Sequence, residues 1–106
     1  MDAKTLAKFE LRAGIMKAMA HPTRLFIVDE LSRSEKCVQE LTDMISADMS
    51  TVSRHLTVLK NAGIIEDDKR GVQVFYTLKL GCVLNFFSCA ESVLKTTAEE
   101  RLQLSE

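Results

Sequence analysis

Residues 48–63, DMSTVSRHLTVLKNAG, carry the side chains whose types and spacing best suit recognition of another molecule. As a helix, this stretch has one apolar stripe formed by Met49, Val52, Leu56 and Leu59. Its opposite face is polar and bears Ser50, Ser53, Arg54 and Thr57. Short hydroxyls let a helix approach phosphate oxygens, and arginine reaches the edges of bases. We interpret the stretch as a DNA recognition helix; the alternative is an ordinary surface helix with a few hydroxyls.

The segment before this helix fits that interpretation. Residues 38–45 have the spacing of a short helix whose inward face is formed by Val38, Leu41, Met44 and Ile45. Ser46, Ala47 and Asp48 then make a turn, and either Asp48 or Ser50 can cap the next helix. Gly63 is suited to end that second helix. Two helices joined by a turn of three or four residues form a helix-turn-helix, whose second helix enters the major groove.

After Gly63 the apolar pattern changes to that of strands. The runs 64–66 and 72–78 are rich in β-branched and aromatic residues, and the sequence Asp-Asp-Lys-Arg-Gly between them predicts a turn. An isolated hairpin is marginally stable, so it must pack on the helices and leave its tip free as a wing. Lys69 and Arg70 near that tip are either solvated or contact phosphate and the minor groove, and their position after a recognition helix favours contact.

Three further helices are predicted around this unit. They cover residues 3–19, 23–32 and 80–97, and a polar link over 33–36 follows the second of them. Pro22 can occupy the first turn of its helix. The first and last helices carry more apolar side chains than the core of a small monomer requires, which predicts a second contact surface.

Composition limits the class of protein. The 106 residues, 46% of them hydrophobic, suit a single domain over residues 1–106, and the net charge of −1 gives no global nucleic-acid signature. We find no bilayer-spanning run and no export signal, so we expect a cytoplasmic protein without a membrane partner, with its three cysteines reduced. A Gly-rich phosphate loop, a chelating His pair and a nucleophile with a base are all missing, which predicts that the chain is not an enzyme.

Four segments in this order, AMAHPTRLFIV, CVQEL, STVSRHLTVLKNAGII and KRGVQVFYTL, resemble the ArsR/SmtB family of winged helix-turn-helix repressors over nearly the whole chain. The resemblance implies a mainly α fold with a small β-hairpin, and a homodimer formed by the first and last helices. It also implies a partner, a double-stranded DNA operator, that is bound without effector and released when an effector binds.

Residues that face DNA in the family correspond here to Ser50, Thr51, Ser53, Arg54, His55, Lys69, Arg70 and Gln73. We expect Arg54 to contribute most. We favour a DNA contact for His55 over a solvated or helix-bonding role only slightly, because histidine reads bases less often than arginine does. His21 matches the family's HPTR turn, where we expect the imidazole to bond neighbouring backbone rather than bind a metal.

The family's effector sites are only partly matched. The zinc-type site on the last helix needs histidine, and none follows Leu80; the arsenic-type Cys-Val-Cys motif is reduced here to Cys37-Val38-Gln39. Cys37, Cys82 and Cys89 remain as candidates for an arsenite, a thiophilic metal ion, an oxidant or a sulfur species. Cys37 precedes a helix, whose dipole favours the reactive thiolate.

Cys82 and Cys89 are seven residues apart, about 10.5 Å along an intact helix, which exceeds the reach of a disulfide. They could still meet if the helix begins after Cys82, if the chain bends, or if a partner subunit or Cys37 supplies another sulfur. The alternative is that these cysteines are structural and the regulator needs no effector. A second alternative is a dimeric scaffold that binds other proteins through the same fold.

Overall fold

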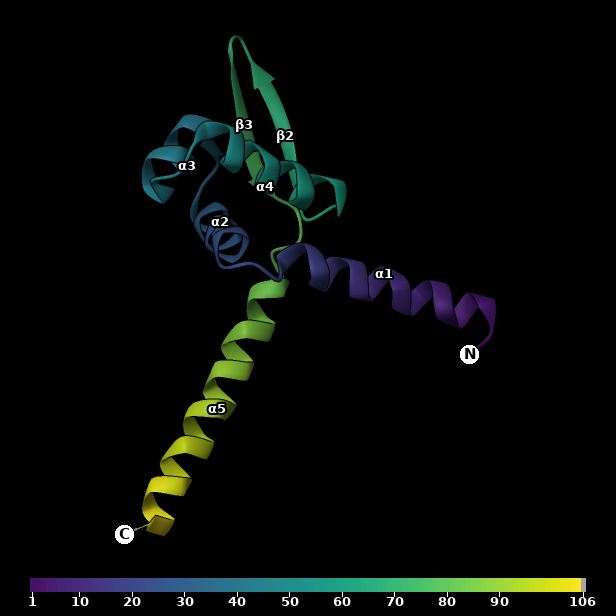
Figure 1. Cartoon of the computed structure of the whole chain (residues 1–106), viewed down its shortest axis with the longest axis vertical. Coiled ribbons are helices and arrows are strands. Elements are labelled where there is room, and N and C mark those ends of the chain that lie inside the picture. The colour runs from purple at the N-terminus through teal and green to yellow at the C-terminus, as the bar shows by residue number, and fades with distance from the viewer. Residues whose placement is uncertain (106) are drawn as a thin grey trace.

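The computed structural model describes residues 1–105, with side chains through residue 103. Five helices and three strands follow one another along the chain (Figure 1). Their bounds are α1 Ala3–Met19, α2 Pro22–Arg33, β1 Lys36–Cys37, α3 Val38–Ile45, α4 Met49–Asn61, β2 Ile65–Arg70, β3 Gln73–Leu78 and α5 Val83–Ser105. The predicted winged helix-turn-helix is confirmed, with α3 and α4 as its two helices and β2–β3 as its wing.

The junction between α1 and α2 is built as the sequence predicted. Pro22 occupies the first position of α2, where its missing N–H costs no hydrogen bond. His21 precedes it in an extended conformation and accepts a hydrogen bond at Nδ1 from the backbone N–H of Thr23, 3.0 Å away. The expected structural role of His21 is therefore confirmed.

The turn between α3 and α4 depends on an unusual backbone conformation. Ser46 ends α3 with φ +59°, in the left-handed region that few non-glycine residues adopt. Asp48 is the N-cap residue of α4, but its side chain makes no capping hydrogen bond, so that part of the sequence prediction is not borne out. Gly63, with φ +79°, stops the chain from continuing as a helix after α4 and turns it into β2.

The sheet is larger than the hairpin predicted from sequence. Its strand order is β1-β3-β2, all antiparallel, and Phe75 of β3 stands between Cys37 of β1 and Asp68 of β2. Lys36, predicted as the end of a polar link, and Cys37 after it form β1, because their backbone groups pair with β3. Residues 67–70, predicted as a turn, continue β2, so the tip of the wing is reduced to Gly71 and Val72.

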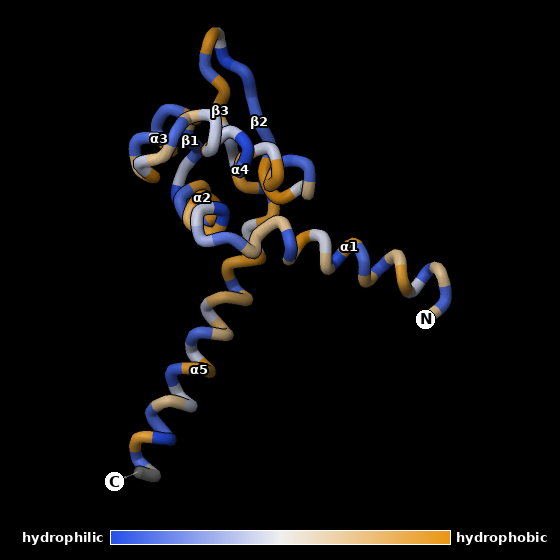
Figure 2. Tube along the Cα trace, in the orientation of Figure 1, coloured by the Kyte–Doolittle hydropathy of each residue, from blue (hydrophilic) through white to orange (hydrophobic). Residues whose placement is uncertain are grey.

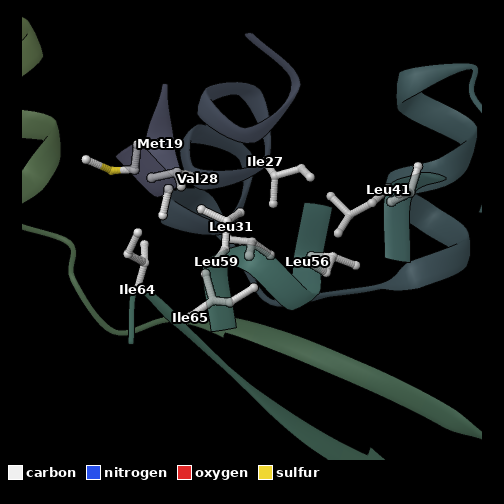
Figure 3. Close-up of a cluster of buried hydrophobic side chains, with 11 residues drawn as sticks. Met19, Ile27, Val28, Leu31, Leu41, Leu56, Leu59, Ile64 and Ile65 are labelled. Carbon is white, nitrogen blue, oxygen red and sulfur yellow. The ribbon is translucent and has the colours of Figure 1, made fainter. Parts of the chain in front are cut away.

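The hydrophobic core lies where α2, α3 and α4 meet the base of the sheet (Figure 3). Leu56 and Leu59 of α4 are fully buried there, together with Ile27 and Val28 of α2 and Leu41 of α3. Glu30 is also buried, and Arg33 one turn later donates a hydrogen bond of 2.7 Å to its carboxylate. The core therefore fixes the recognition helix against the rest of the head, the unit formed by α2–α4 and the sheet.

The helices α1 and α5 project from the head in different directions (Figure 1). The Cα radius of gyration is 17.3 Å, against about 13 Å for a compact domain of this length. Hydrophobic residues recur along both helices where the chain provides no cover (Figure 2), and Phe9, Met16, Phe86 and Leu94 are exposed. The helix α5 extends beyond the predicted 80–97 at its C-terminal end and begins three residues later. None of the described helices is both long and apolar enough to cross a bilayer.

Candidate nucleic-acid interface

One face of the helix α4 packs on the core, and the opposite face is exposed to solvent. Val52, Leu56 and Leu59 have no exposed surface, so the predicted apolar stripe is confirmed at these positions. Met49, predicted in the same stripe, is 43% exposed because the first turn of α4 extends beyond the core. Ser50, Arg54 and Thr57 are all exposed on the opposite face. The helix therefore presents a polar surface that the core does not need.

Hydrogen bonds on this outer face leave most of its donors free for a ligand. Thr57 Oγ1 donates to the backbone carbonyl of Ser53, 3.0 Å away, which turns the hydroxyl toward its own helix. Arg54 Nη2 donates to Thr51 Oγ1 over 3.4 Å, a long and weak bond. Within residues 1–103, Arg54 is in none of the salt bridges found. Its guanidinium can therefore bond a base edge or a phosphate without losing an ion pair.

His55 lies at the edge of the outer face and contacts α2 and the turn before it. Its ring centroid is 4.5 Å from that of His21, and its Nδ1 is 3.5 Å from Arg24 Nη1. Burial lowers the pKa of His55, and the nearby His21, Arg24 and Arg54 lower it further. His55 therefore connects the recognition helix to the junction of α1 and α2, a contact across 34 residues that no sequence pattern indicated.

Ion pairs neutralise two of the four cations in α4 and the wing. Lys60 of α4 bonds Asp67 of β2 over 2.8 Å, which raises the pKa of the ammonium and lowers that of the carboxyl. Arg70 is paired with Glu35 and Asp68. Lys69, like Arg54, is exposed and forms no salt bridge within the described side chains. The chain has little net charge, yet the pairing leaves two free cations, one on α4 and one on the wing.

A groove of about 410 Å³ separates the start of α4 from the wing. Ser53 and Gln73, both expected at the interface, lie on its two sides, and Cys37 forms part of its wall. The structure thus places six of the expected DNA-facing residues on α4's outer face or at the wing. Thr51 and Arg54 contact each other through the long bond within α4, whereas the side chains of His55 and Arg70 are engaged by residues outside their own helix or strand.

Comparison with known proteins identifies the family. A family model described as bacterial regulatory protein, arsR family, matches residues 21–67, which run from the start of α2 into β2. The HTH-type transcriptional regulator MJ1325 of Methanocaldococcus jannaschii is 39% identical over 72 residues, 67% of this chain and 81% of that protein. The chain belongs to the ArsR family.

Two further similar proteins are a named repressor and a domain solved as a homodimer. The transcriptional repressor SmtB of Mycobacterium tuberculosis is 39% identical over 64 residues, 60% of this chain; the chain spans only about half, 47%, of SmtB. The homodimeric winged helix-turn-helix DNA-binding domain of Mb0332 from Mycobacterium bovis has 25% identity and a TM-score of 0.78. That match covers 94% of this chain and 93% of the Mb0332 domain, so the fold is shared from α1 into α5.

The three cysteines of this ArsR-family chain are all free thiols. Cys37 is 6% exposed and is the N-cap residue of α3, where its backbone N–H donates to Glu40 Oε1 over 3.1 Å. This hydrogen bond lowers the pKa of Glu40. Cys82 and Cys89 are exposed; Cys82 lies in the turn directly before α5, so residues 83–88 of the helix separate the two thiols. Within residues 1–103, no three His, Cys, Asp or Glu side chains are grouped to hold a metal ion.

Proposed function

We propose that this chain is a transcriptional repressor that binds a double-stranded DNA operator as a homodimer. The outer face of α4 carries this proposal. Its inner face is fully buried at Val52, Leu56 and Leu59, whereas Arg54 is exposed beside small hydroxyls and free of any carboxylate within the described side chains. Such a face can enter the major groove and bring a bidentate donor to a base edge. The named repressor SmtB among its relatives supports the same activity.

We assign the DNA contacts by the position of each side chain. Arg54 reads a base, while Ser50, Thr51 and Ser53 approach the phosphates or base edges next to it. On the wing, Lys69 and Gln73 contact the sugar-phosphate backbone of the DNA. His55 contributes at the edge of this surface, where its neutral ring is packed against His21. Arg70 belongs to the wing surface, but its charge is already paired.

The homodimer is proposed to form through α1 and α5. A cavity of about 370 Å³ with an almost entirely apolar lining lies between α1, α2 and α5. The apolar side chains beyond it, such as Phe86 and Leu94, are left exposed by the single chain. We propose that a two-fold dimer covers them and sets two copies of α4 at the spacing of half-sites about 34–36 Å apart on a duplex. Mb0332, a homodimer, supports this arrangement.

The test of DNA binding starts from a random pool of duplexes selected on the purified protein. We expect the affinity for the selected duplex to fall steeply with salt, because phosphate contacts release counterions. Arg54→Ala should weaken binding to that duplex by about 1–3 kcal/mol and relax its sequence preference. Lys79→Ala removes an exposed positive charge outside α4, the wing and the two proposed dimerisation helices, and serves as the matched control. A protein that selects no sequence, or an Arg54→Ala variant with full affinity for the selected duplex, would refute the proposal.

We further propose that a thiophilic effector releases the DNA by reacting with Cys37, Cys82 and Cys89. All three are free thiols, and two of them lie at or near the start of the proposed dimerisation helix α5. A ligand there can change the position of α5 relative to the head and so couple effector to operator. Duplex binding should be measured while arsenite, Zn²⁺, Cd²⁺, peroxide or a persulfide is added. A variant with all three cysteines changed to serine that still released DNA like the parent would refute this mechanism.

A further inference from the structure

Arg70 has its guanidinium occupied by the chain itself. Nη1 and Nη2 donate to the two carboxylate oxygens of Glu35 over 2.6 and 2.8 Å, and Nε donates to Asp68 Oδ2 over 2.9 Å. The guanidinium carbon also lies 4.7 Å from the centre of the Phe75 ring. Every nitrogen of the group therefore donates to a carboxylate, and one face of the plane stacks on an aromatic ring.

The side chains of β2 alternate between two faces of the sheet, and Arg70 lies on the face turned away from α4. Asp67 bonds Lys60 of α4, so its face is the one toward the recognition helix. Asp68 points the opposite way, and Arg70, two residues on, shares its face. Lys69 alternates back to the face of Asp67. The two adjacent cations of the wing therefore lie on opposite faces, and Lys69 is the one on the side of α4.

The ion pair of Arg70 with Glu35 crosses the sheet. Arg70 ends β2 at one edge, Phe75 is in the central strand β3, and Glu35 directly precedes β1 at the other edge. Glu35 also belongs to the connection that leaves the core helix α2. The bidentate bond therefore ties the tip of the wing to the head across the middle strand. Among residues 1–103, the wing's other salt bridge to this part of the chain joins Asp67 to Lys60 of α4.

We propose that Glu35 and Arg70 form a clasp that sets the orientation of the wing for DNA binding, and that Lys69 supplies the wing's phosphate contact. This inference rests on the proposed DNA-binding function. Arg70 is a positioning residue in this arrangement, because three of its five N–H groups already bond two carboxylates, whose negative charges repel a phosphate beside them. The charge of Glu35 alone would repel DNA. Through the clasp, however, this carboxylate favours DNA binding because it orients the wing.

The titration behaviour of the pair keeps the clasp closed near neutral pH. The hydrogen bonds from Arg70 lower the pKa of Glu35, and the two carboxylates raise the pKa of Arg70. Glu35 is therefore ionised throughout the range in which DNA binding would be measured. Salt screens such exposed pairs, so the clasp is strongest at low ionic strength.

The sign of the effect of Glu35→Gln tests the clasp. Removing a negative charge near DNA should tighten binding, and the matched control for that effect is Glu66→Gln, an exposed carboxylate on the same strand and face as Arg70. Loss of the clasp should instead weaken binding by about two- to five-fold per wing, or roughly 4- to 25-fold for a dimer. Hydrogen exchange at the β2–β3 amides, without DNA, should speed up in Glu35→Gln and stay unchanged in Glu66→Gln.

A second pair of variants separates positioning from phosphate contact. Lys69→Gln should reduce the slope of log affinity against log salt by about 0.9 per wing. Arg70→Gln should weaken binding with a smaller change in that slope, because it removes a salt-screened ion pair and no phosphate contact. The double variant Glu35→Gln with Arg70→Gln should bind no more weakly than Arg70→Gln alone. Thermal unfolding of each variant establishes that the head is folded.

These outcomes are distinct from those that test DNA binding itself. A wild-type protein with no salt-dependent affinity for any duplex refutes the proposed function, and with it any role of the clasp in DNA binding. If the wild type binds but Glu35→Gln binds equally well or more tightly, only the clasp is refuted. A fall in salt slope for Arg70→Gln equal to that for Lys69→Gln overturns it as well, because it makes Arg70 a phosphate contact.

Discussion

Leu94→Ala should weaken the homodimer while leaving the single chain folded. Leu94 is 69% exposed on the outer half of α5, where the chain itself offers it little contact. Complete burial of a leucine side chain stabilises by about 1.5–3 kcal/mol, so covering the exposed part is worth roughly 1–2 kcal/mol in each copy. A two-fold interface loses this contribution twice. The expected loss is about 2–4 kcal/mol, or roughly a 30- to 900-fold rise in the dimer dissociation constant.

Sedimentation equilibrium over a range of protein concentrations measures that constant directly. The control is Glu99→Ala, five residues further along α5 and therefore about 140° around the helix from Leu94. It should dimerise like the parent, and circular dichroism should show equal helix content in all three proteins. If Leu94→Ala dimerised as tightly as the parent, α5 would not form the interface, and the spacing proposed for the two recognition helices would have no basis.

Three further predictions follow from the head. Leu56→Ala, which empties a fully buried position, should lower the free energy of unfolding in urea by about 2.7–5 kcal/mol, whereas Val58→Ala on the exposed side of α4 should cost under about 1 kcal/mol. The pKa of His55 is lowered in the fold, so its stabilising contribution is present above its ordinary pKa near 6.5 and is lost as pH falls through the lowered value. His55→Gln should therefore reduce the difference in unfolding free energy between about pH 7.5 and pH 5; an unchanged difference would contradict the assignment. A thiol reagent should label the exposed Cys82 well before the buried Cys37, and equal rates in the folded protein would contradict the placement of Cys37.

The helices could be predicted from sequence because their signals are local. The spacing of apolar residues gave α3 and α4 their bounds, and Pro22 and Gly63 marked a helix start and a helix end through their own backbone preferences. The outward face of α4 followed from the same periodicity, since whatever the core does not bury must face solvent. Met49 departed from the pattern because periodicity says which side a residue is on but not how far the core extends.

The contacts that organise the interface could not be predicted, because they join residues far apart in the chain. Two residues make β1 a strand only when β3 lies beside them, so neither residue type nor alternation identifies it. Arg70 is paired with a carboxylate 35 residues away, and His55 with a ring 34 residues away. The net charge of −1 gave no global nucleic-acid signature. It could not say that Arg54 and Lys69 would be the cations left free.

The strand β2 lies at the outer edge of the sheet, with one side of its backbone unpaired. Such an edge can recruit a strand from another molecule, and the usual protection is a row of charged side chains. Five consecutive charged residues, Glu66 to Arg70, occupy this strand. The charged residues that include Lys69 and Arg70 of the wing thus also hinder edge-to-edge pairing of β2 with the sheet of another molecule. Substitutions that remove the acidic residues of β2 would raise the affinity for DNA but lower the solubility of the protein.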